Sequence, residues 1–146
     1  MCGIIGGNKY KNVDKVKDGL KSIMHRGIDD NTIFSFDDKM FISHNRLSIQ
    51  DLSEEANQPM VSYDSRYYLA FNGELWKSSF DKFDDELRDK YKFRTDRSDS
   101  ELLLYYLIHN IENLETSLRE LDGMFAFALY DSKTDTTYLG RDFIGR

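Results

Sequence analysis

Strand-like segments lie at the two ends of the chain and helix-like segments lie between them, and this order restricts the folds available to it. Short apolar or alternating stretches bounded by turn residues occur at 2–7, 32–36, 40–49, 67–71, 124–130 and 136–142. Helical spacing begins at Val13, at Ser78 or Ser79, and at Asp96 or Ser98. A further helix is expected over 112–121. A doubly wound parallel sheet would alternate strands with helices, so the order favours a layered α+β domain.

Local patterns also predict how neighbouring segments connect. Two hairpins are expected, one from 32–36 and 40–49 and the other from 124–130 and 136–142. The turn-rich stretch 25–31 is expected to form a loop. We therefore expect antiparallel pairing at both ends of the chain.

Composition excludes several classes of protein. The chain has 146 residues, of which 40% are hydrophobic, enough for one domain with a real core. A net charge of −6 argues against a nucleic-acid surface. No long apolar run occurs near the start, which argues against a signal peptide and a membrane span. A single cysteine fits a reducing compartment, so we expect a cytoplasmic protein.

That single cysteine, Cys2, follows the start methionine directly. Its position is either accidental or the sign of an amino-terminal nucleophile that removal of Met1 exposes. A terminal amine has a pKa of about 7.7–8.0 and a thiol about 8.5, so the amine can take the thiol proton without a histidine. Cys2 alone leaves both interpretations open.

Asn72 and Gly73 follow the predicted strand at 67–71. An Asn-Gly pair after an apolar strand is a strong hairpin signal, so the strand is expected to stop there. In the alternative interpretation, the Asn72 amide and the Gly73 backbone N–H are two donors aimed at a developing oxyanion.

Arg46 and Asp99 each have a structural and a functional interpretation. Arg46 lies in an apolar stretch, where its guanidinium needs a carboxylate from the protein or from a substrate. Asp99 follows Ser98 at the start of a predicted helix, where it belongs to a cap or binds the ammonium group of a ligand.

The sequence shows neither a metal-binding pattern nor a nucleotide-binding pattern. His25, His44 and His109 have no metal-ligand spacing with Cys2, so neither a metal nor a catalytic histidine is expected. Glycine-rich nucleotide-binding loops do not occur, so no cofactor is expected in this chain.

Taken in order, eight segments resemble the class II glutamine amidotransferase domain, and most of all the amino-terminal domain of asparagine synthetases. They are MCGIIG (1–6), HRGIDD (25–30), HNRLSIQDL (44–52), QPM (58–60), FNGEL (71–75), SDSE (98–101), LDGMFAFALYD (121–131) and GRDFIG (140–145). The resemblance implies the amino-terminal-nucleophile hydrolase fold, a four-layer αββα sandwich.

The resemblance also implies roles for the catalytic residues. Cys2 would attack the side-chain amide of L-glutamine and form a γ-glutamyl thioester, which water cleaves to glutamate. Asn72 and Gly73 would form the oxyanion hole. The ammonia would pass to a synthetase domain or subunit.

Binding residues follow from the same resemblance. Arg46 would hold the glutamine α-carboxylate, and Glu74 and Asp99 would receive its α-ammonium. Backbone groups near Ile49 and Gln50 would line the pocket. These charges suit glutamine, which carries one anion and one cation on its α-carbon.

In the family, the pattern continues beyond GRDFIG into a further strand. Residues 1–146 are therefore expected to be an amidotransferase domain that is incomplete at its carboxyl end, without the synthetase domain that would use ATP and Mg²⁺. Missing strands leave sheet edges open and favour association, so a homodimer is a candidate assembly. A catalytically inactive interaction module and an amidase with another substrate are the alternative functions.

Departures from the family pattern affect packing and remove none of the implied catalytic or substrate-binding residues. Ile28 stands where the family usually has proline, and Trp76-Lys77 replaces a Tyr-Asn pair. Arg97 precedes Ser98-Asp99, where a small or polar residue is common.

Overall fold

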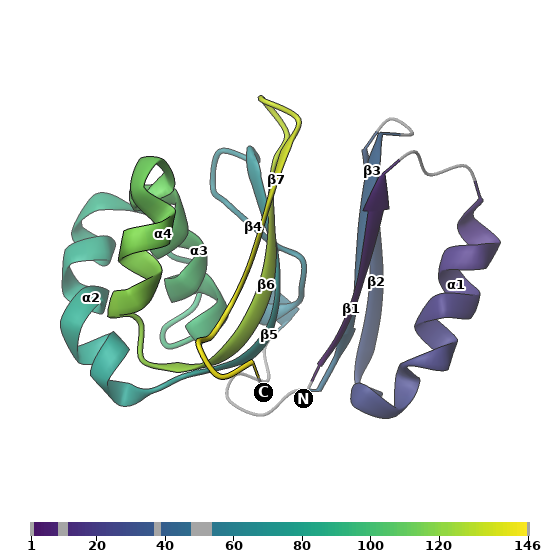
Figure 1. Ribbon diagram of the computed structural model, residues 1–146, viewed down its shortest axis with the longest axis horizontal. Helices are drawn as coiled ribbons and strands as arrows, with labels where there is room; N and C mark the ends of the chain where they lie inside the picture. Colours follow the sequence, from purple (N-terminus) through teal and green to yellow (C-terminus); the bar gives the residue numbers. More distant parts are fainter. Residues whose placement is uncertain (1, 9–11, 37–38, 48–53, 146) are drawn as a thin grey trace.

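The computed structural model describes residues 2–8, 12–36, 39–47 and 54–145. Two β-sheets face each other, and helices cover the outer face of each sheet (Figure 1). This arrangement confirms the predicted α+β class and the αββα order of layers. In the ranges described, no helix is long and apolar enough to cross a membrane.

The first sheet has three antiparallel strands in the order β1-β3-β2, with α1 on its outer face (Figure 1). Gly3 pairs with Asn45, and Asp30 pairs with Arg46, so the starts of β1 and β2 meet the end of β3. Its elements are β1 (Gly3–Asn8), α1 (Val13–Ser22), the 3₁₀ turn η1 (Met24–Arg26), β2 (Asp30–Phe36) and β3 (Met40–Arg46).

The second sheet has four antiparallel strands in the order β4-β5-β6-β7, with α2, α3 and α4 on its outer face (Figure 1). Its strands are β4 (Met60–Val61), β5 (Tyr67–Leu75), β6 (Gly123–Asp131) and β7 (Thr136–Arg141). The helical elements are η2 (Glu54–Ala56), α2 (Lys77–Lys90), α3 (Asp99–His109), η3 (Ile111–Asn113), α4 (Leu114–Ser117) and η4 (Leu118–Glu120).

Two apolar clusters hold the layers together. Helix α3 is buried along nearly its whole length between β5 and α2, as expected for a helix that is apolar on all sides. Leu69 and Phe71 of β5 join this cluster, whereas Ala70 packs with Ile42 between the two sheets. Alternate residues of β5 therefore pack into a hydrophobic core on each face of the second sheet.

The predicted hairpins are confirmed, but several strand boundaries differ. β2 and β3 pair antiparallel, as do β6 and β7. The predicted loop at 25–31 is wrong in part, because it contains η1 and the first residues of β2. In the described residues β3 ends at Arg46, and the end of the predicted strand, 48–49, lies outside them.

Helix boundaries also differ from the predictions. Neither Ser78 nor Ser79 caps α2, whose cap position is Trp76. The Ser79 hydroxyl instead donates to the backbone oxygen of Asp122 (2.9 Å) and accepts from its N–H (2.8 Å), a pairing between distant parts of the chain. Ser98, not Asp96, precedes α3, and the single helix predicted over 112–121 is three short pieces.

The predicted turn at Asn72-Gly73 is wrong, because β5 continues to Leu75. Gly73 pairs with Phe125 of β6, and its φ of 152° lies in the region that favours glycine. A side chain at Gly73 would overlap the backbone oxygen of Met124. The glycine therefore allows β5 and β6 to approach closely rather than to separate in a turn.

We expect Gly73→Ala to lower the free energy of unfolding by about 1–3 kcal/mol or more, because alanine strains this backbone conformation. Gly19→Ala in helix α1 is the matched control, since its new Cβ would meet only the end of the Ile5 side chain at 3.1 Å. Its stability should stay within about 1 kcal/mol of the parent. Urea denaturation measures both, and equal stability of the two variants would contradict the account.

Candidate active site

Cys2 lies directly before β1, beside the end of β3. Its Sγ accepts a hydrogen bond from the backbone N–H of Leu47 at 3.5 Å and lies 3.8 Å from the Leu47 oxygen. The backbone oxygen of Cys2 accepts a bond from Nε of Arg26 at 3.1 Å. Cys2 is half-buried, with its thiol on Leu47 and its backbone oxygen on Arg26.

Arg46, the last residue of β3, is therefore next to the backbone that contacts the thiol. Its side chain is buried, and its guanidinium donates to Oδ1 of Asn57. The backbone oxygen of Arg46 accepts from the N–H of Asp29 at 3.0 Å. These contacts fix the end of β3, and the buried cation belongs to the residue before Leu47, which contacts Cys2.

The carboxyl end of β5 lies at the same end of the sandwich as the amino terminus (Figure 1). In this segment, Oδ1 of Asn72 is buried, and no residue in the described ranges bonds to it. Such an acceptor without a partner is uncommon in proteins, and it lies in the residue expected to serve the oxyanion hole.

Strand alternation gives the direction of the Gly73 N–H. The N–H of Phe71 donates to Oε1 of Gln58 (2.6 Å) and that of Leu75 to Oδ2 of Asp99 (3.4 Å), both away from β6. Alternate residues of a strand direct their N–H groups to the same edge, so Gly73 directs its own there too. β4 pairs with Tyr68 and Leu69, and no strand of the described residues pairs with this edge beyond them.

Asp99 is the buried acid of the site. Its exposed fraction is 8%, and burial raises its pKa to about 6, with a further rise from the charge of Glu74. Glu74 is exposed on β5. The two carboxylates thus differ in environment, and Asp99 changes charge close to neutral pH.

Glu101 holds the loop that precedes Asp99, and sequence reasoning missed this role. Its fully buried carboxylate accepts bonds from the N–H of Arg94 (2.9 Å) and from the N–H and hydroxyl of Thr95 (2.7 Å each). A glutamate three residues after Ser98 is the sequence signal of a capping box. Here it instead folds the preceding loop against the start of α3.

Cys2 contacts Leu47, the residue after Arg46, and Asp99 bonds the N–H of Leu75 at the end of β5, whereas the catalytic and binding roles of these residues stay predictions. Ile49 and Gln50 lie outside the described residues. His44, which was assigned no role, is buried and points from β3 to the second sheet, where its Nε2 lies 3.3 Å from the Phe71 oxygen. In the part of the chain described, no three histidine, cysteine or acidic side chains form a metal-binding group.

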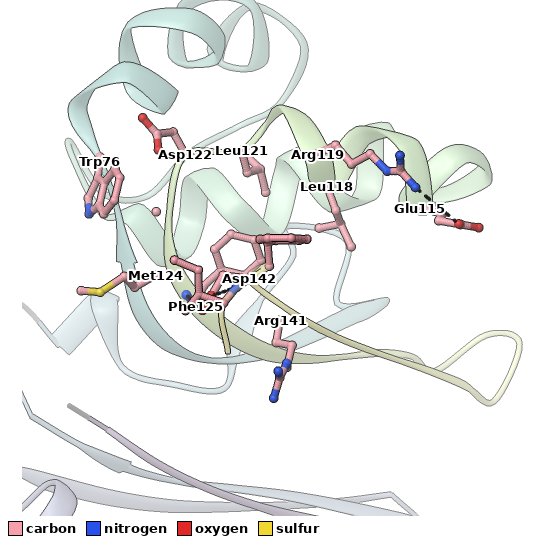
Figure 2. Close-up of a pocket in the computed structure, with 13 residues that line it drawn as sticks. Trp76, Glu115, Leu118, Arg119, Leu121, Asp122, Met124, Phe125, Arg141 and Asp142 are labelled. Atoms are coloured by element: carbon pink, nitrogen blue, oxygen red, sulfur yellow. Dashed lines mark hydrogen bonds and ion pairs between the residues drawn. The ribbon is translucent and has the colours of Figure 1, made fainter. Parts of the chain in front are cut away.

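Two cavities lie away from these residues. One, of about 540 Å³, borders the start of β6 and includes Trp76, Phe125 and Asp142 (Figure 2). The other, of about 490 Å³, lies between α1 and the first sheet. Neither is lined by Cys2 or Asp99, and the first touches the site only through residues such as Phe125, the strand partner of Gly73.

Solved structures give an independent comparison of the fold. A glutamine phosphoribosylpyrophosphate amidotransferase from Bacillus subtilis superimposes with a TM-score of 0.74 at 20% identity, over 99% of this chain and 38% of that one. This similarity confirms the predicted amino-terminal-nucleophile hydrolase fold.

Sequence comparison gives the family. Similar proteins include asparagine synthetase B [glutamine-hydrolyzing] of Escherichia coli, 35% identical over 99% of this chain and 26% of that protein, and asparagine synthetase [glutamine-hydrolyzing] 1 of Saccharomyces cerevisiae, 34% identical over 99% and 24%. The chain thus spans about a quarter of the length of these relatives. A family model described as a glutamine amidotransferase domain matches residues 1–146, and the chain belongs to this family of enzyme domains.

Proposed function

We propose that this chain hydrolyses the side-chain amide of glutamine to glutamate and ammonia, with Cys2 as the nucleophile. The observation that carries the proposal is the placement of the Cys2 thiol against Leu47 and beside Arg46, at the end of the sandwich where β5 also ends. Membership of the glutamine amidotransferase domain family supports the choice of substrate.

Removal of Met1 would free the α-amine of Cys2 to act as the base. The thiolate attacks Cδ of glutamine, an S–C bond forms, and the carbonyl electrons move to oxygen. Collapse breaks the C–N bond, and the nitrogen takes a proton from the α-ammonium of Cys2 and leaves as ammonia. Water then cleaves the γ-glutamyl thioester, which releases glutamate and restores the thiol.

The oxyanion formed in this step needs donors at the edge of β5. The Gly73 N–H is directed there, and the Asn72 amide is the second candidate donor. Loss of one such donor costs about 10²–10³ in kcat in other enzymes, so both groups are needed at full rate.

The α-carbon groups of glutamine have partners of opposite charge. Arg46 would bind the α-carboxylate through its guanidinium, and Glu74 and Asp99 would bind the α-ammonium. Backbone groups of Ile49 and Gln50 would complete the pocket.

The ammonia would be used by a synthetase domain or subunit, because several relatives are named glutamine-hydrolysing asparagine synthetases. ATP and Mg²⁺ would belong to that partner. A homodimer and a cytoplasmic location remain predictions from the sequence.

Cys2→Ala should reduce glutamine-dependent glutamate release to background, because it removes the sulfur that forms the thioester. Its unfolding transition should remain close to that of the parent, since Cys2 is only half-buried. Measurement of glutamate release by both proteins, after mass spectrometry has shown loss of Met1, checks this. Release that persists in Cys2→Ala would contradict the assigned nucleophile, and no release from folded, processed parent would favour an inactive interaction module.

The pH dependence tests the role of Asp99. With a pKa of about 6, Asp99 becomes neutral below that pH and loses its attraction for the α-ammonium. Protonation of the Cys2 amine alone lowers kcat/KM about tenfold per pH unit below about 7.7–8.0, so the added loss of Asp99 should steepen the fall to about a hundredfold per unit well below pH 6. Asp99→Asn should be slower and should keep only the tenfold slope, and an equally steep fall in both proteins would contradict the assignment.

A further inference from the structure

Phe71, the residue before Asn72, has both of its backbone polar groups bonded by side chains from outside its own strand. Gln58, in the loop before β4, accepts the Phe71 N–H on its Oε1 at 2.6 Å. His44, on β3 of the first sheet, meets the Phe71 oxygen through Nε2 at 3.3 Å. Both side chains are nearly fully buried, so neither bond competes with bulk water.

The contacts continue from Gln58 to the acid of the site. Nε2 of Gln58 donates to Oγ of Ser100 at 3.1 Å, and Ser100 follows Asp99 in α3. Asp99 in turn accepts the N–H of Leu75. A closed circuit therefore runs from Phe71 through Gln58, Ser100 and Asp99 to Leu75, and back along β5.

This circuit surrounds Asn72, Gly73 and Glu74. Because β4 stops opposite Tyr68 and Leu69, no strand in the described ranges pairs with this edge from Phe71 onward. Side chains hold the N–H groups of Phe71 and Leu75 in place of a strand. A strand in that position would have taken the Gly73 N–H as well, whereas the two side-chain acceptors bond only its neighbours.

His44 acts in this contact as a neutral donor. Burial lowers its pKa to about 4, and the charge of Arg46 acts in the same direction, so the ring is uncharged at neutral pH although Asp30 is near. A carbonyl oxygen only accepts, so the proton lies on Nε2. This contact ties β3, which ends beside Cys2, to the strand that carries the oxyanion donors.

We propose that His44 and Gln58 are positioning residues that set the Gly73 N–H and the Asn72 amide relative to the Cys2 thiol, and that Gln58 also sets Asp99 through Ser100. The proposal rests on the proposed glutamine hydrolysis. His44 joins the two sheets, and Gln58 joins the oxyanion strand to the helix that bears the α-ammonium partner.

Steady-state kinetics of the full chain separate the two roles. His44→Leu should lower kcat at least tenfold and change KM for glutamine less than threefold, because it frees the oxyanion strand alone. His44→Gln, which keeps an N–H donor, should restore most of kcat. Gln58→Met should lower kcat and raise KM, whereas Ser100→Ala should mainly raise KM.

Ser117→Ala is the matched control. Its hydroxyl is also buried and also bonds a backbone oxygen, that of Asn113 at 2.8 Å, but it lies outside the circuit. Kinetic constants of this variant should equal those of the parent. If His44→Leu and Gln58→Met also keep parental constants, or if His44→Gln is as slow as His44→Leu, the proposal is overturned.

Amide hydrogen exchange of Leu75 distinguishes failure of this proposal from failure of the proposed function. Gln58→Met removes no atom bonded to Leu75, yet it should speed exchange of that N–H at least fivefold, because Asp99 loses its support. Ser117→Ala should leave the rate unchanged. An inactive parent with this response would refute the glutaminase function alone, and unchanged exchange in Gln58→Met would refute the circuit. Where His44→Leu does not fold, His44→Gln and Gln58→Met carry the test.

Discussion

The edge of β5 between Phe71 and Leu75 is the constraint on which the rest of the site depends. A strand edge without a neighbour has unpaired backbone groups, which must find other partners. Here Gln58 and Asp99 bond the two outer N–H groups, and the Gly73 N–H between them is directed to the same edge. The edge is thus held in an extended conformation, and no strand within the described residues closes it.

Contacts between the layers bring the amino terminus and this edge to the same end of the sandwich (Figure 1). Pairing of β1 with β3 brings Cys2 to Leu47, and His44 connects β3 with Phe71 across the two sheets. Close approach of β6 requires glycine at position 73 and fixes the far side of β5. The placement of Cys2 and of the end of β5 at one end of the sandwich is therefore a property of two packed sheets rather than of one loop.

Hydrophobic patterns predicted most of the fold, because the spacing of apolar residues in these segments matches the face that the folded strand or helix buries. Alternation in 124–130 predicted β6, and the apolar run after Ser98 predicted α3. Long-range contacts decided the failures. Asn72-Gly73 has a strong local turn preference, but pairing with β6 keeps it in a strand, and the bonds of Ser79 with Asp122 override its expected cap.

The side chains expected to perform chemistry could be named from their types and from the family resemblance. The supporting side chains could not, because their partners lie outside the spacings that local sequence patterns describe. Glu101 has the pattern of a capping box but bonds Arg94 and Thr95, and His44 finds its partner only when the two sheets stack. Gln58 likewise bonds Phe71 and Ser100, which no local spacing connects.

The central claim is that Cys2 is a free amino-terminal nucleophile within a formed glutamine site. Intact-mass spectrometry after incubation with a glutamine analogue that bears a diazoketone in place of the amide tests it most directly. The account predicts a chain without Met1 that carries one adduct, located on Cys2 and suppressed by excess glutamine. A processed, folded chain that gains no adduct, or one whose labelling glutamine does not suppress, would contradict the claim.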